Sequence, residues 1–155
     1  MKRYRAKQDD LHGTDSNNPG FWTNGHVLYP DSAFIPNKKQ LRVKDKTGMM
    51  DSLVSMRGKY PLTIEDGSWS NGGTSSYHST RFSFAHRPLG NTLCDDKCKQ
   101  HTFAQTRYLV PITSDKKHNY TFWADNANSA ITVLCDGKFW GLVMPMRADG
   151  FEKIA

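Results

Sequence analysis

The stretch that decides the fold is Asn119–Met146, which reads NYTFWADNANSAITVLCDGKFWGLVMPM. It contains three runs of aromatic and β-branched residues of the kind that forms β-strands, at 120–124, 131–135 and 138–143. Asp136-Gly137 separates the last two runs and is typical of a type I′ hairpin turn, because both turn positions need a positive φ. The stretch therefore predicts three consecutive strands, the last two joined as a tight hairpin.

Shorter segments with the same character precede this stretch. The clearest is 77–85, where Phe82 and Phe84 alternate with Arg81 and other polar residues. Further strands are predicted at 40–44, 60–65 and 103–112. With no sustained helical period, roughly seven to nine short strands indicate a mainly β fold, an antiparallel β-sandwich or jelly roll. Alternation in the last strand predicts that Trp140 and Leu142 share one face of the strand, and that Phe139 and Val143 share the opposite face.

The start of the chain differs in composition from the rest. Residues 1–26 are mostly polar, and Asn17–Gly20 is typical of a turn. We interpret 1–26 as an extended arm and 27–155 as the β-sandwich domain. Phe21 and Trp22 would be the anchors of this arm, docked either on the chain's own core or on a neighbouring molecule.

The net charge and the basic clusters of the chain indicate which kinds of partner it could bind. The chain has 155 residues, enough for one domain, and a formal net charge of +6. One basic cluster lies at 38–46. The other consists of Lys2, Arg3, Arg5 and Lys7. These clusters either keep the surface solvated or contact nucleic acid or an acidic protein surface. No apolar run follows the basic start, so the sequence predicts no secretion signal and no membrane partner.

The cysteines leave three readings open. Their odd number, three, argues against a disulfide scaffold. Cys94, Cys98 and His101 lie close enough in sequence to suggest a zinc site, and the two cysteines could instead form a disulfide. The spacing matches no common zinc knuckle, so we expect a polar loop with reduced thiols, and no metal or cofactor.

Motifs of catalysis are missing from the sequence. It contains no Gly-x-Ser-x-Gly elbow, no phosphate-binding loop and no dinucleotide fingerprint. The paired carboxylates, such as Asp95-Asp96, sit in turn-like contexts. We therefore expect a protein that is not an enzyme and has no catalytic residue, with a metal-dependent nuclease as a weaker alternative.

Aromatic residues outside the predicted core suggest a binding surface. Trp69 lies in the Gly/Ser/Asn-rich segment 68–76, which predicts an exposed loop. Together with Tyr77 and Arg81 it is the candidate ligand or interface site, because exposed aromatic rings stack on sugars or anchor protein interfaces. Trp123 and Trp140 are expected in the core.

Several of these elements carry a family resemblance. The segments 79–84, 120–124 and 131–137 resemble the carbohydrate-binding-module-like jelly rolls found in glycan-active enzymes and in phage decoration, tail and capsid-associated proteins. Many virion proteins share this architecture, and the extended arm favours a structural β-sandwich subunit of a bacteriophage-type virion over a free module. Such a subunit would cement or decorate an assembly through protein–protein contacts and the arm. It would be assembled in the host cytoplasm and join other virion proteins as a homo-oligomer or symmetric lattice. The resemblance implies no ligand residue. The alternatives are a glycan-binding module or host-receptor adhesin and, less strongly, a nucleic-acid-binding protein.

Overall fold

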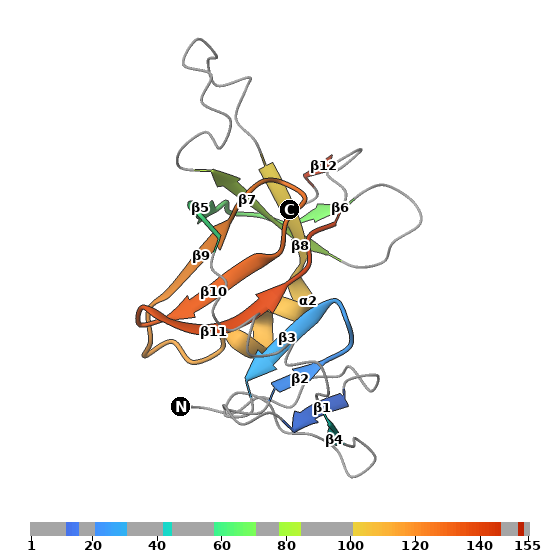
Figure 1. The fold of residues 1–155 in the computed structure, drawn as a ribbon. Helices are drawn as coiled ribbons and strands as arrows, with labels where there is room; N and C mark the ends of the chain where they lie inside the picture. Colours follow the sequence, from blue (N-terminus) through green and yellow to red (C-terminus); the bar gives the residue numbers. More distant parts are fainter. Residues whose placement is uncertain are drawn as a thin grey trace.

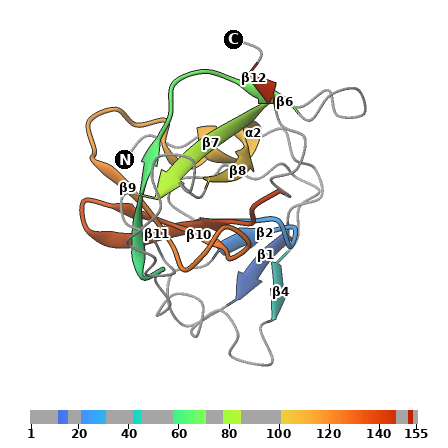
Figure 2. The same cartoon turned by 90° about the horizontal axis from the view of Figure 1, so that it is seen from above.

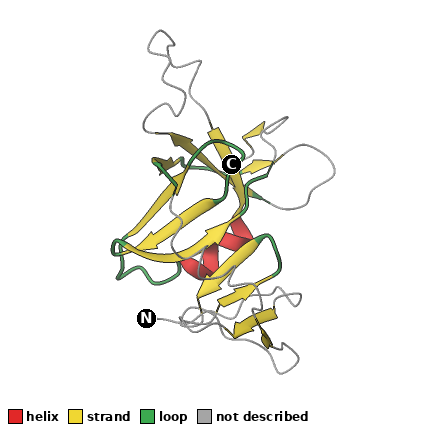
Figure 3. Ribbon diagram, viewed as in Figure 1, coloured by secondary structure: helices red, strands yellow, loops and turns green. Residues whose placement is uncertain are grey.

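A computed structural model gives the fold (Figure 1). It describes residues 12–15, 21–30, 42–44, 58–70, 78–84, 101–146 and 152–153. The fold is mainly β, as the sequence predicts, and a single twelve-stranded sheet contains every strand of the described residues. Figure 3 shows the short helical segment beside these strands. No helix in this described part of the chain is long and apolar enough to cross a membrane.

The described residues contain twelve strands. They are β1 (His12–Asp15), β2 (Phe21–Thr23), β3 (Val27–Pro30), β4 (Arg42–Lys44), β5 (Tyr60–Ile64), β6 (Trp69–Ser70), β7 (Ser79–Phe84), β8 (His101–Gln105), β9 (Tyr120–Ala124), β10 (Ile131–Cys135), β11 (Lys138–Val143) and β12 (Glu152–Lys153). The helical turns α2 (Thr106–Leu109) and η2 (Val110–Ile112) lie between β8 and β9.

The predicted three-strand stretch is confirmed. β9, β10 and β11 have the expected bounds, and β10 pairs antiparallel with both of the others. Asp136 and Gly137 have φ values of 51° and 84°, so both turn positions are left-handed as a type I′ turn requires. This meander is the centre of the sheet.

The sheet folds over on itself to enclose the core. Its strand order is β12-β6-β7-β5-β9-β10-β11-β3-β2-β1-β4, with β8 pairing β7. Figure 2 shows β7 and β8 as a layer above β10 and β11, with β5 at the corner. After β11 the chain crosses to the other layer, where the N–H of Met146 donates to the carbonyl of Phe103 at 2.7 Å. The expected sandwich is thus made from one continuous sheet.

The main core lies between these two layers. Phe82 is fully buried, and its ring contacts that of Phe122 at a centroid distance of 5.1 Å. β5 separates β7 from β9 in the sheet, so this ring contact marks the sharp bend at β5. A second, smaller cluster forms around Phe21, Leu28 and Leu142.

A β-bulge changes the predicted faces of β11. Val133 pairs with Gly141, but Leu134 pairs with Phe139, so Trp140 is the extra residue of the bulge. Trp140 and Val143 consequently pack on the main cluster, while Phe139 packs on the smaller one with Leu142. The predicted sharing of faces in this strand is wrong, because a bulge shifts the two-residue alternation by one.

The start of the chain is also corrected. β1 and β2 lie within the segment interpreted as an arm, and both belong to the sheet. Phe21 and Trp22 are each only 2% exposed, in the chain's own core. The expected boundary after residue 26 therefore falls inside the sheet, and these two side chains are not anchors on a neighbour. Residues 1–11 and 16–20 lie outside the described residues.

The strand predicted at 103–112 ends early. β8 stops at Gln105, and the chain then turns through α2 and η2. Tyr108, Leu109 and Ile112 are buried with the spacing of a helical turn, whereas Val110 is exposed. Pro111 lies in the first turn of η2, where its fixed φ and missing N–H fit a helical start but would interrupt a central strand.

Candidate functional site

The site predicted around Trp69 is built differently from the expectation. Trp69 is 8% exposed, because β6 pairs with β7 and the indole packs edge-on against Phe103 at 6.0 Å. The exposed Trp69 expected from its polar loop is therefore wrong. Arg81 does lie beside it, with its guanidinium 3.7 Å from the centre of the indole ring. Tyr77 lies outside the described residues.

Arg81 is held in place by Glu65. Its Nε donates to one carboxylate oxygen, and its second nitrogen, Nη2, donates to the other at 3.0 Å. The N–H of Glu65 also donates to the carbonyl of Arg81 at 2.9 Å. One edge of the guanidinium thus meets a carboxylate and one face meets Trp69, an arrangement that braces β5 against β7.

The predicted zinc residues are only partly described. His101 lies on β8, with its Nδ1 3.5 Å from a carboxylate oxygen of Glu65. It therefore belongs to the Glu65–Arg81 cluster in this structure. Cys94 and Cys98 lie outside the described residues, as do the four basic residues predicted to contact an acidic surface, Lys2, Arg3, Arg5 and Lys7.

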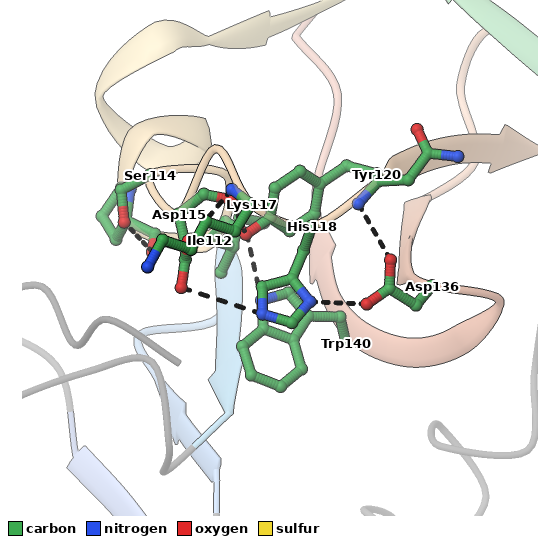
Figure 4. Close-up of polar contacts among 10 residues, drawn as sticks. Ile112, Ser114, Asp115, Lys117, His118, Tyr120, Asp136 and Trp140 are labelled. Atoms are coloured by element: carbon green, nitrogen blue, oxygen red, sulfur yellow. Dashed lines mark hydrogen bonds and ion pairs between the residues drawn. The ribbon is translucent and has the colours of Figure 1, made fainter.

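A second polar cluster lies where the loop before β9 meets the β10–β11 turn (Figure 4). The Nδ1–H of His118 donates to Oδ2 of Asp136 at 2.5 Å, and the N–H of Asn119 donates to Oδ1 of the same carboxylate at 2.9 Å. In return, the N–H of Asp136 donates to the carbonyl of Asn119 at 2.8 Å. The positive φ of Asp136 aims its carboxylate at this loop, so the hairpin turn and the loop are fastened together.

A second carboxylate faces the other side of the imidazole. Oδ2 of Asp115 lies 3.8 Å from Nε2 of His118, and Asp115 is 9% exposed. Its Oδ1 accepts the N–H of Lys117 at 3.1 Å, and its carbonyl accepts the hydroxyl of Tyr120 at 3.0 Å. His118 is therefore placed between two carboxylates, one buried and one exposed.

A thiol completes the cluster. Cys135 is a buried free cysteine at the end of β10. Its Sγ, a ring nitrogen of His118 and a carboxylate oxygen of Asp136 all lie within 4.8 Å of one another, so these three residues could hold a metal ion. Without a metal, burial raises the pKa of the Cys135 thiol above its usual value, and the carboxylates of Asp136 and Asp115 raise that pKa further. The neutral thiol is a weak nucleophile.

Cys135 is expected to alkylate slowly in the folded protein. Because its pKa is raised and the side chain is buried, its reaction with iodoacetamide at about pH 7.5 should be roughly tenfold or more slower than in the urea-unfolded chain. Mass spectrometry of the Cys135 peptide from metal-free protein measures both rates. Equal rates in the folded and unfolded chains would show that the thiol is accessible and ionised.

The Asp136 contact is expected to weaken in acid. The hydrogen bond from His118 is the main cause that lowers the pKa of Asp136 below its usual value, and the N–H of Asn119 lowers it further. The contact therefore stabilises the fold above the unfolded pKa of 3.8, and this stabilisation is lost as the pH falls through the lower folded pKa. Urea unfolding between about pH 2 and 5 should show a shallower pH dependence in Asp136→Asn than in the wild type. Asp66→Asn, in the exposed Asp-Gly turn after β5, is the matched control and should retain the wild-type dependence.

Sequence reasoning did not find this cluster. Asp136 is visible in the sequence only as a turn residue, and His118 has no fixed relation to it because 18 positions separate them. Asp115 and His118 are three residues apart, a weak signal in a loop. Only the register of β9 against β10, which pairs Tyr120 with Cys135, brings the loop to the turn. Comparisons of the chain with protein-family models, with curated proteins and with solved structures each found no match.

Proposed function

We propose that the protein is a non-enzymatic structural subunit of a virus particle of the bacteriophage type. It would be assembled in the host cytoplasm and would act through protein–protein contacts, as part of a homo-oligomer or symmetric lattice. The proposal rests on the end of the sheet at β4, where no second strand of the described residues pairs with this edge, because an unpaired sheet edge is a place where another chain can attach.

β4 is the last strand in the order of the sheet. It pairs in parallel with β1 through Gly13↔Arg42, Thr14↔Val43 and Asp15↔Lys44, and no other described strand pairs with it. Figure 1 shows β4 at the lower end of the sheet. The strand belongs to the basic segment 38–46. Lys and Arg on an edge oppose indiscriminate strand pairing and favour contact with an acidic surface.

The same chain offers acidic groups elsewhere. Asp66 and Asp125 are exposed, and they lie in the turns after β5 and β9. These turns are separate from β4 in the sheet order. Opposite charges at two different places on one chain support a head-to-tail contact between copies, and such a contact generates rings or extended lattices.

The glycan-binding alternative has less support from the geometry. A sugar would need an open aromatic face, but Arg81 covers one face of Trp69 and the side chain is buried. The Glu65–Arg81 pair would also have to open before either group could bind a ligand. Nucleic-acid binding would use the same basic segment. Titration with duplex DNA separates this alternative from self-association.

Reversing the charge of β4 is expected to abolish self-association. Sedimentation velocity of the full chain at low salt should show larger species in the wild type and a monomer in Arg42→Glu/Lys44→Glu. The matched control is Lys138→Glu/Lys153→Glu, which changes the net charge equally at exposed positions on β11 and β12 and should still assemble. Added salt should weaken the wild-type assembly, because exposed charges are screened within about 10 Å at 0.1 M.

Two results would contradict the proposal. A wild-type chain that stays monomeric at every concentration and salt level is not a lattice subunit of this kind. Equal assembly by the β4 variant and its control would place the contact elsewhere. The same proteins are titrated with duplex DNA and applied to a glycan array, so that a monomer with tight binding to either ligand identifies the alternative function.

A further inference from the structure

We infer that His118, Cys135 and Asp136 form a zinc site, a property independent of the proposed role in assembly. The three donor atoms come from two places in the chain, the loop before β9 and the end of β10 with its turn. They lie within 4.8 Å of one another. Around a tetrahedral zinc, bond lengths of about 2.0–2.3 Å separate ligand atoms by roughly 3.3–3.6 Å, so small side-chain movements are enough.

The kinds of donor atom select the metal. A thiolate with an imidazole and one carboxylate suits Zn²⁺, which takes sulfur, nitrogen and oxygen ligands in tetrahedral geometry. Mg²⁺ and Ca²⁺ prefer shells made of oxygen atoms, which this cluster does not supply. Coordination replaces the hydrogen bond between His118 and Asp136, whose atoms move apart to make room for the ion.

Asp115 lies where an outer carboxylate of such a site would be. Ligating histidines commonly direct their other ring nitrogen at a carboxylate, which fixes the tautomer and the ring orientation. Here Nδ1 of His118 faces the donor oxygen of Asp136, and Nε2 faces the buried carboxylate of Asp115 at 3.8 Å. With the metal on Nδ1, the imidazole proton lies on Nε2 and points at Asp115, while the Cys135 thiol proton leaves to solvent.

The site has both a protected side and an open side. Cys135 is buried, whereas the side chain of Asp136 is 52% exposed. Three protein ligands leave the fourth tetrahedral position to water or to a group from outside, on the solvent side where Asp136 lies. Figure 4 shows the loop and the hairpin turn on the two sides of the His118–Asp136 contact, so a bound zinc would clamp them together.

Cobalt substitution tests this site directly. Tag-free full-length protein is titrated with Co²⁺ and then with Zn²⁺ as a competitor. We expect one Co²⁺ per chain, tetrahedral d–d bands and a near-ultraviolet thiolate-to-cobalt charge-transfer band, all displaced by Zn²⁺. The charge-transfer band should disappear in Cys135→Ser and persist in Cys94→Ser/Cys98→Ser, which removes the other two thiols of the chain.

Further variants separate the ligands from the outer carboxylate. His118→Gln and Asp136→Asn should lower the affinity for Co²⁺ more than Asp115→Asn does, and Asp115→Asn should lower it about 10–100-fold. His78→Gln and Asp66→Asn are exposed controls that should bind like the wild type. Circular dichroism confirms that each variant is folded before it is titrated.

The outcomes decide the inference. Absence of a charge-transfer band in the folded wild type overturns it. A band that survives in Cys135→Ser, or that is lost in Cys94→Ser/Cys98→Ser, also overturns it, because the thiolate then comes from the other cysteines. Sedimentation of the same samples is scored separately, so failure of the zinc site and failure of the assembly proposal are distinguishable.

Discussion

Trp22→Ala is expected to lower the free energy of unfolding of the isolated chain by about 3–5 kcal/mol. Trp22 is 2% exposed and belongs to the main core cluster, where it pairs across the ladder with Tyr29. Removing the indole leaves a cavity that the paired strands around it cannot close. Urea unfolding followed by circular dichroism measures the loss. If this variant is too unstable to study, Trp22→Phe should show a smaller loss in the same direction.

The control for this prediction is Trp123→Ala. Trp123 is only partly buried on β9, and its Nε1–H donates to Thr121 on the same face at 3.1 Å. We expect a clearly smaller loss of stability there. Trp22→Ala with wild-type stability would mean that Trp22 packs on a neighbouring molecule, as an assembly arm would require, and would contradict the fold described for β2.

Phe82→Ala is the second large effect, with an expected loss of about 3–5 kcal/mol. Phe82 has no exposed surface, and its ring contacts that of Phe122 across the bend at β5. A stability of about 5–15 kcal/mol is usual for a domain, so this one substitution would remove a large share of it. Chemical unfolding gives the value.

Phe139→Ala is the matched control for Phe82. Phe139 is half-buried and packs on the smaller cluster, edge-on against Phe21 at 5.9 Å. Phe139→Ala should lower the free energy of unfolding clearly less than Phe82→Ala does. Similar losses at the two positions would show that the smaller cluster contributes as much as the core between the layers, and would contradict the assignment of the main core.

Local features of the sequence predicted the three strands β9, β10 and β11 well. Asp136-Gly137 determines its own turn, because few other residue pairs accept two positive φ values, and the flanking β-branched runs then pair in register. The exposure of Trp69 could not be predicted in this way. Its neighbours in sequence are polar, and its burial depends on β7 and on Arg81, which is 12 positions later in the chain.

The bulge in β11 and the polar cluster around His118 could not be predicted from the sequence either, for a similar reason. The bulge at Trp140 accompanies a close approach of β11 to β3, where a Cβ on Gly141 would lie 2.5 Å from the carbonyl oxygen of Leu28. His118 and Cys135 become neighbours only through the register of β9 on β10. Both features depend on contacts between segments that are distant in the sequence, and alternation within one strand carries no information on them.

Electron microscopy of the purified chain at low salt shows whether the protein assembles as a lattice-forming subunit. We expect regular rings, sheets or filaments of a single repeating unit, which disappear in Arg42→Glu/Lys44→Glu and persist in Lys138→Glu/Lys153→Glu. Uniform single particles of monomer size in the wild type, at every concentration and with or without Zn²⁺, would contradict this expectation.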